Sequence, residues 1–182
     1  MFELSSIRRL LVTAGVAGSL ALGAVLPASA HVVVSPSSTA AGSYSLLTFS
    51  FGHGCDGSAT TELAIQIPEG VEIVRPAIDA LWSIETVSAE TDATAESGHA
   101  PISEVVFTAN EPVPDGYYAS VQIQVQLPDG NEGDAIAFPV IQTCETGESA
   151  WIQIPDDGQS ADDLDTPAPV VTLSAAVEGS GH

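Results

Sequence analysis

The chain has 182 residues, enough for one or at most two domains, and it carries 24 acidic residues against three arginines, a formal net charge of −21. Nucleic acid and anionic membrane surfaces repel such a protein, so we expect neither as a partner. Only one acid but two of the arginines precede residue 31, which leaves 23 acids and the single base Arg75 in the rest of the chain. We interpret most of this charge as an adaptation for solubility, including solubility in a salty medium.

The first 30 residues have the order of parts that is typical of a secretory signal peptide. Arg8 and Arg9 precede an apolar stretch from Leu10 to Leu26, and Ala28-Ser29-Ala30 is a small-residue cleavage site. An uncleaved anchor is the alternative, because the apolar stretch has about the length of a short membrane span. The cleavage site favours removal of residues 1–30, which leaves a soluble secreted or periplasmic protein that does not span the membrane.

After residue 30, apolar and polar residues alternate with the period of β-strands. The clearest case is Val121–Leu127, where four aliphatic residues fall on one face and three glutamines on the other. Further strands are predicted at His31–Val34, Phe49–Phe51, Leu63–Ile67, Ile84–Val87, Val105–Phe107, Ile136–Val140, Trp151–Ile154 and Val170–Leu173. Turn signals such as Asp56-Gly57 and Pro128-Asp129-Gly130 separate these runs, and no stretch has a helical period of useful length. Many short strands joined by such turns predict an all-β protein built as a β-sandwich.

The predicted domain organisation is simple. We expect a single β-sandwich domain over residues 31–177, and we see no internal repeat. Ala89–Ala100 is polar and small and is predicted to be a loop. Asp156–Pro169 is acidic and contains proline, and is predicted to be a loop that leads to the last strand. Residues 178–182 are predicted to be a frayed tail.

Two cysteines, Cys55 and Cys144, have only one way to pair. An exported protein reaches a compartment that permits disulfides. The bridge would close a loop of about 90 residues, for which the chain-entropy estimate is on the order of 4 kcal/mol. It would also bring His53, two residues before Cys55, close to Trp151. A pair of metal-binding thiolates is the alternative.

His31 becomes the first residue if cleavage follows Ala30. Its free α-amine and its imidazole can then bind one metal ion together. Such an all-nitrogen chelate suits Cu(II), which prefers tetragonal N/O sites and has the highest affinity among the divalent first-row metals. The alternative is that a histidine at this position is incidental.

The remaining candidates are three histidines and a tryptophan. His53 lies in a glycine-flanked turn, whereas His99 and His182 are interpreted as solvated. Trp151 shares a strand face with Gln153 while two isoleucines take the other face, so Trp151 is either part of a second packing surface or the wall of a site. Nothing in the sequence indicates a Ser-His-Asp triad, a phosphate-binding loop or a dinucleotide fingerprint.

Taken together, these motifs resemble the YcnI-like domain family of bacterial exported proteins. The segments that carry the resemblance are His31–Val34, Ala41–Tyr44, Phe51–Thr60, Ile67–Val71, Pro114–Tyr118, Phe138–Glu145 and Trp151–Pro155. The resemblance covers essentially all of the chain after residue 30. It implies an immunoglobulin-like β-sandwich that binds Cu(II) through its N-terminal histidine, with a carboxylate completing the site and a tryptophan close by. Carried across, it assigns the copper chelate to His31 and the nearby tryptophan to Trp151.

This sequence departs from the family pattern in two places. Where the characterised branch has its glutamate, this chain has Gly52–Gly57, so His53 is our first choice and Asp56 our second choice for the added copper ligand. Ala80-Leu81-Trp82 replaces the Pro-Gly that often precedes the family's other tryptophan.

The function we predict is copper trafficking or buffering outside the cytoplasmic membrane, without enzymatic activity. The expected partners are the copper ion and either other exported copper-handling proteins or a membrane copper transporter. Two alternatives remain open, namely an oxidative enzyme of the histidine-brace type and a metal-free adhesion or interaction sandwich.

Overall fold

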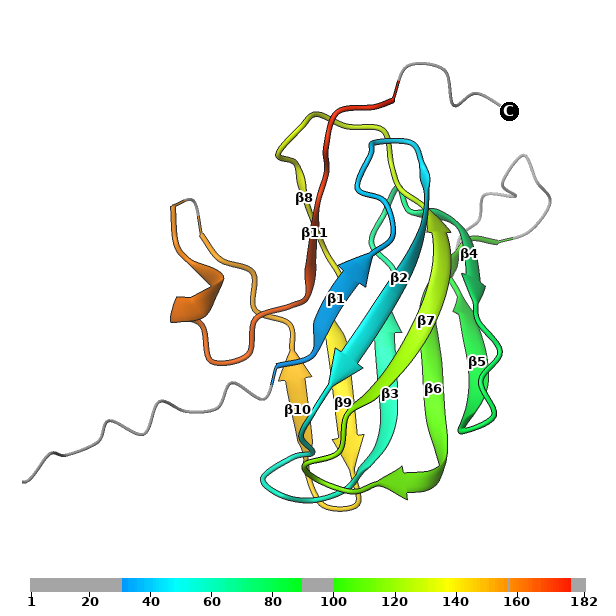
Figure 1. Ribbon diagram of the computed structural model, residues 1–182, viewed down its shortest axis with the longest axis vertical. Helices are drawn as coiled ribbons and strands as arrows, with labels where there is room; N and C mark the ends of the chain where they lie inside the picture. Colours follow the sequence, from blue (N-terminus) through cyan, green and yellow to red (C-terminus); the bar gives the residue numbers. More distant parts are fainter. Residues whose placement is uncertain (1–30, 90–99, 157, 178–182) are drawn as a thin grey trace, which may run out of the picture.

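The computed structural model of the protein describes residues 31–89, 100–156 and 158–177 (Figure 1). The predicted signal peptide, His99, and the predicted tail with His182 lie outside these residues. Within the described ranges, no helix has the length and apolar character needed to cross a membrane. The elements follow one another as β1 (Val33–Pro36), β2 (Tyr44–Phe51), β3 (Thr60–Gln66), β4 (Glu72–Pro76), β5 (Trp82–Ser88), β6 (Ile102–Val113), β7 (Ala119–Gln126), β8 (Ala135–Ala137), β9 (Val140–Cys144), β10 (Glu148–Trp151), the 3-10 helix η1 (Ala161–Asp163) and β11 (Val170–Thr172).

The strands form a sandwich of two antiparallel sheets, with a small third sheet at one end (Figure 1). One main sheet has the order β1-β2-β7-β4 and the other has the order β10-β9-β3-β6-β5, while β11 pairs with β8. Every strand pair is antiparallel. The predicted all-β sandwich is therefore confirmed.

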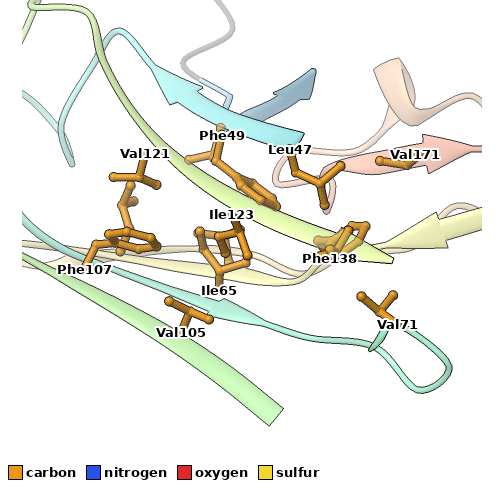
Figure 2. Close-up of a cluster of buried hydrophobic side chains, with 14 of the residues drawn as sticks. Leu47, Phe49, Ile65, Val71, Val105, Phe107, Val121, Ile123, Phe138 and Val171 are labelled. Carbon is orange, nitrogen blue, oxygen red and sulfur yellow. The ribbon is translucent and has the colours of Figure 1, made fainter. Parts of the chain in front are cut away.

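The core lies between the two main sheets, and β7 supplies one of its walls (Figure 2). Val121, Ile123 and Val125 are at most 1% exposed, as the alternation in this strand predicts. They belong to the same cluster as fully buried residues of the opposite sheet, among them Ile65 and Phe107. Burial of each such side chain is worth about 1.5–3 kcal/mol relative to exposure, so this face of β7 is a main source of stability.

Some of the strand predictions are wrong in detail. The predicted strand Ile136–Val140 is two strands in different sheets, because Phe138 bonds through its N–H to the Pro169 carbonyl (2.8 Å) and Pro139 has no N–H to donate. The sequence analysis also missed β4, whose pairing with β7 shifts register between Glu72 and Arg75 and whose residues do not alternate regularly in burial. An irregular strand of this kind leaves no period to detect.

The predicted strand Trp151–Ile154 begins where β10 ends. After Trp151 the chain leaves the sheet, and the N–H groups of Ile152 and Gln153 both donate to the Thr166 carbonyl (3.1 and 3.0 Å). Trp151 points into the core and is 6% exposed, whereas Ile152 and Ile154 are 48% and 64% exposed. Trp151 therefore packs in the main core, and the two isoleucines lie on the outward face.

Two predicted loops flank these elements. Of Ala89–Ala100, residues 90–99 lie outside the described part of the chain, and the N–H of Ala89 donates to the Pro101 carbonyl across the base of the segment (2.8 Å). The predicted loop Asp156–Pro169 contains η1, where the Ser160 hydroxyl accepts a hydrogen bond from the N–H of Asp162 (3.2 Å).

Candidate metal centre

A disulfide joins Cys55 and Cys144, as predicted, with 5.9 Å between their Cα atoms. Cys55 opens a tight two-residue turn in which Cys55 and Ser58 exchange backbone hydrogen bonds of 3.2 and 2.9 Å. Asp56 and Gly57 both have positive φ, 49° and 84°, which is the geometry of a type I′ turn and explains the Asp-Gly pair. The backbone of Asp56 therefore has a structural role in this turn.

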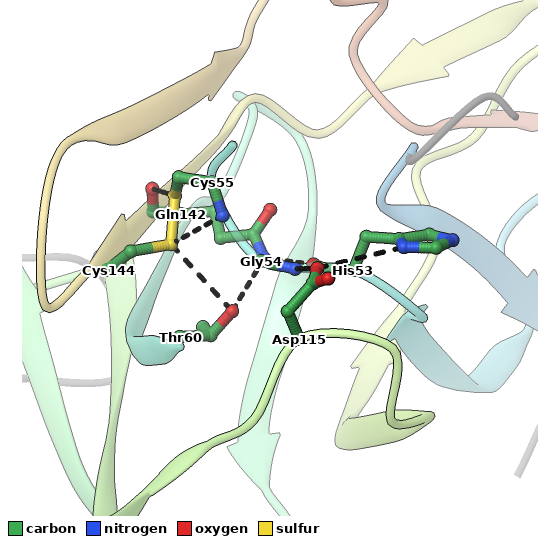
Figure 3. A network of polar contacts seen from close by, with 7 residues as sticks. All are labelled: His53, Gly54, Cys55, Thr60, Asp115, Gln142 and Cys144. Atoms are coloured by element: carbon green, nitrogen blue, oxygen red, sulfur yellow. Dashed lines mark hydrogen bonds and ion pairs between the residues drawn. A yellow bond between two sulfur atoms is a disulfide. The ribbon is translucent and has the colours of Figure 1, made fainter. Parts of the chain in front are cut away.

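Gln142 lies beside the disulfide and is fully buried, with 0% exposure (Figure 3). Its side-chain oxygen accepts a hydrogen bond from the indole N–H of Trp151 (3.0 Å). Its amide nitrogen donates to the carbonyl of His53 and to the hydroxyl of Thr60, both at 2.8 Å. An indole N–H can only donate and a backbone carbonyl can only accept. The Gln142 oxygen must therefore face Trp151, and the Gln142 amide nitrogen must face His53.

His31 contacts the ring of Trp151. The two ring centroids are 5.4 Å apart and the planes meet at 70°, an edge-to-face arrangement. The neighbouring residue Val32 is 2% exposed, so the chain is anchored in the core directly after His31. The imidazole is half-buried and lies over the indole at the edge of the sandwich.

The start of β1 also lies near the His53 turn. β1 pairs with β2 with Val33 opposite Ser50 and Val34 opposite Phe49. The residues before β1 therefore run alongside the residues that follow β2, where Gly52 and His53 are found. In Figure 3 the ring of His53 extends from this turn toward the side of the molecule on which β1 begins.

The carboxylate beside His53 belongs to Asp115, not to Asp56. Nδ1 of His53 is 3.7 Å from Oδ1 of Asp115, with both side chains partly exposed, and the N–H of Gly54 donates to the same oxygen (2.9 Å). Asp115 lies in the β6–β7 connection, where the Tyr117 N–H donates to the Pro114 carbonyl (3.2 Å). The sequence identified Pro114-Asp115-Gly116 as a turn, but no local pattern could show that this turn meets the β2–β3 turn.

The structure therefore brings most of the predicted site residues into one connected group. Gln142 joins the backbone of His53 to Trp151, and Trp151 contacts His31. Within the described residues, no three side chains of histidine, cysteine, aspartate or glutamate gather closely enough to form a metal site by themselves. Gln142 and Asp115 are the members that the sequence analysis missed. A buried glutamine has no sequence signal of its own in a strand such as Val140–Cys144.

A sandwich of two antiparallel sheets of this kind is typical of immunoglobulin-like domains. A solved structure supports this class: the crystal structure of an uncharacterized protein from Nocardia farcinica, described as having an immunoglobulin-like fold, matches with a TM-score of 0.65 and 26% identity over 81% of this chain and 100% of that chain. Residues 31–173 match the family described as Domain of unknown function (DUF1775), so the chain belongs to that family.

Two further comparisons add little. A putative membrane anchored protein from Corynebacterium diphtheriae gives a TM-score of 0.37 at 12% identity, over 85% of this chain and 35% of that chain, which is too low to indicate a shared fold. No curated protein matches.

Proposed function

We propose that this protein is exported and holds one Cu(II) ion through His31, using the α-amine and one imidazole nitrogen of that residue. The observation that carries the proposal is the edge-to-face contact between the His31 imidazole and the buried Trp151, at 5.4 Å between centroids. This contact holds the imidazole in one orientation, as a chelating residue requires.

The donor chemistry supports the proposal. A processed N-terminal histidine offers two nitrogens from one residue, so the site needs no cluster of three side chains, and the described residues contain none. Imidazole and amine nitrogens suit Cu(II). The apolar face of Trp151 beside the ring would limit the access of water to the metal.

His53 is the further ligand that we propose. Its turn follows β2, beside the start of β1, and its side chain is 46% exposed. Its Nδ1 is the ring nitrogen nearer to Asp115, and this leaves Nε2 available to a metal on the other side of the ring (Figure 3). Asp56, the second choice, has less support because it contributes its backbone to the type I′ turn and the carboxylate near His53 is Asp115.

Export and processing are part of the same proposal. The family match begins at His31, directly after the Ala28-Ser29-Ala30 cleavage site. We propose copper trafficking or buffering outside the cytoplasmic membrane, with exported copper-handling proteins or a membrane copper transporter as partners. Intact-mass analysis of the exported protein should give a chain that starts at His31, and any other start removes the α-amine from the site.

The proposal is tested by an N-terminal extension. One alanine is inserted between Ala30 and His31 so that the exported protein starts with alanine and the His31 nitrogen becomes an amide. We expect loss of high-affinity Cu(II) binding and a changed electron paramagnetic resonance spectrum, whereas the same alanine added after His182 should change neither. Equal affinity and an identical spectrum in the N-terminally extended protein would show that the chelate is not at His31.

The unmodified protein should also select its metal and respond to pH. Cu(II) should bind more tightly than Zn(II), following the order of divalent affinities. The α-amine must lose its proton before it binds, so the apparent Cu(II) affinity should fall as the pH drops below neutral. Competition titrations at several pH values measure both effects.

A further inference from the structure

Gln142 is a fully buried polar residue near the candidate copper centre. It has 0% exposure, and its amide makes three hydrogen bonds, to Trp151, His53 and Thr60. Burying an amide without partners costs about 1–3 kcal/mol in proteins, so the side chain is tolerated here only because it is fully bonded. An aliphatic residue would fill the same position without this requirement. The glutamine therefore has a use that apolar packing does not supply.

Two of the three hydrogen bonds connect the two halves of the proposed site. Through its oxygen, Gln142 fixes the indole of Trp151, and that indole contacts the imidazole of His31. Through its nitrogen, it fixes the carbonyl of His53 (2.8 Å). The Gln142 amide thus sets the position of the indole that contacts His31, and it also sets the backbone position of His53.

The network is anchored at its inner end by the disulfide. Thr60 is 0% exposed, accepts the second hydrogen bond of the Gln142 amide nitrogen, and has its hydroxyl 3.9 Å from Sγ of Cys144. A sulfur in a disulfide carries no hydrogen, so the Thr60 hydroxyl is the donor in that contact. Thr60 therefore links the amide of Gln142 to the disulfide, whereas the hydrogen bonds of Gln142 with His53 and Trp151 lie on the side of the proposed copper site.

We propose that Gln142 is a positioning residue that sets the spacing between His31 and His53 and so allows both imidazoles to reach one Cu(II) ion. This inference rests on the proposed copper function. Outer residues that orient metal ligands typically change metal affinity about 10- to 100-fold when they are replaced.

The test replaces Gln142 by methionine, which keeps the volume and removes the hydrogen bonds. We expect Q142M to weaken Cu(II) binding by about 10-fold or more and to lose the spectroscopic coupling of one imidazole nitrogen. The matched control is Q124M, at an exposed glutamine of β7. This control should bind Cu(II) as the unmodified protein does.

A combination with H53A separates positioning from general destabilisation. If Gln142 acts through His53, adding Q142M to H53A should cost much less affinity than Q142M costs alone. A full additional loss in the H53A background would overturn the inference. A folded Q142M variant with unchanged affinity and spectrum would do the same.

A metal-free measurement keeps this inference distinct from the copper function. Without copper, the ring of Trp151 should shift the NMR signals of the His31 ring protons, and Q142M should reduce that shift while Q124M should not. If the N-terminal extension leaves Cu(II) binding intact, the proposed copper site at His31 is wrong, and a reduced shift in Q142M then still supports the positioning of Trp151. An unchanged shift in Q142M contradicts that positioning whether or not copper binds.

Discussion

In both β7 and the segment Trp151–Ile154, aliphatic residues alternate with other residues along the chain. β7 buries its aliphatic face, whereas the segment at Trp151 exposes its aliphatic residues. In β7 the aliphatic face is inside and Gln124 is exposed. After β10 the two isoleucines are outside, and Trp151 with its indole N–H is inside. A strand period predicts that two faces exist, but it does not state which face meets the core.

The difference comes from the position of each strand in its sheet. β7 lies between β2 and β4 and faces the opposite sheet along its length, so its aliphatic face is covered. β10 is an edge strand that pairs only with β9, and the chain turns away after Trp151 to bond with the segment near Thr166. The inward indole needs an acceptor, and Gln142 of the neighbouring strand provides it. Burial at the edge thus depends on a polar partner and a nearby cross-link.

The largest effect should come from that cross-link. Replacing Cys55 and Cys144 together by alanine should lower the free energy of unfolding by about 4 kcal/mol, because the bridge closes a long loop in the unfolded chain. Urea unfolding of the oxidised protein and of the double variant measures the difference. A loss below about 1 kcal/mol would mean that β7 and the core, rather than the edge around Trp151, carry nearly all of the stability.

A matched pair of isoleucines tests the comparison directly. Ile123→Ala removes a fully buried side chain of β7 and should cost about 2–5 kcal/mol. Ile154→Ala removes a side chain that is 64% exposed and should change stability by less than about 0.5 kcal/mol. Both are measured by the urea midpoint. Comparable losses in the two variants would show that Ile154 is covered in solution.

Sequence reasoning identified what depends on local pattern and composition. The sandwich class, the inward face of β7 and the Cys55–Cys144 bridge follow from alternation, turn residues and the cysteine count. The sequence analysis missed the break at Pro139, although a proline inside an apolar run disfavours a continuous strand. The sequence did not reveal that the two halves of Ile136–Val140 join different sheets. Such a division depends on partners that lie far away in the chain.

The same limit applies to the candidate site. His31 and Trp151 were identified from a cleavage motif and a family resemblance, and they are in contact. Asp115 and Gln142 were missed, since each acts through a residue more than 60 positions away, Gly54 for the first and His53 for the second. Nothing in the sequence distinguishes this turn aspartate or this strand glutamine from others of their kind. Their contacts with the candidate site exist only in the folded chain.

A smaller effect is expected for the hydrogen bond that distinguishes the Trp151 edge from β7. W151F removes the donor, Q142M removes the acceptor, and each single variant also changes packing. A double-mutant cycle on the free energy of unfolding should therefore give a favourable coupling of about 1 kcal/mol between the two residues. The control cycle pairs W151F with Q124M and should give no coupling. Zero coupling in the first cycle would mean that the indole is held by packing alone.

The smallest effects should come from two aspartates near the same edge. Asp56→Asn should change the free energy of unfolding by less than about 0.5 kcal/mol, because asparagine also tolerates the positive φ of this turn. It should leave Cu(II) affinity unchanged, because Asp56 has a backbone role. Asp115→Asn keeps an acceptor for the Gly54 N–H but removes the charge 3.7 Å from His53, so it should weaken Cu(II) binding by about threefold. Competition titrations of the two variants measure the contrast. The reverse result, with Asp56→Asn the weaker binder, would make Asp56 the ligand and would place the metal at the turn beyond Cys55 instead of between His31 and His53.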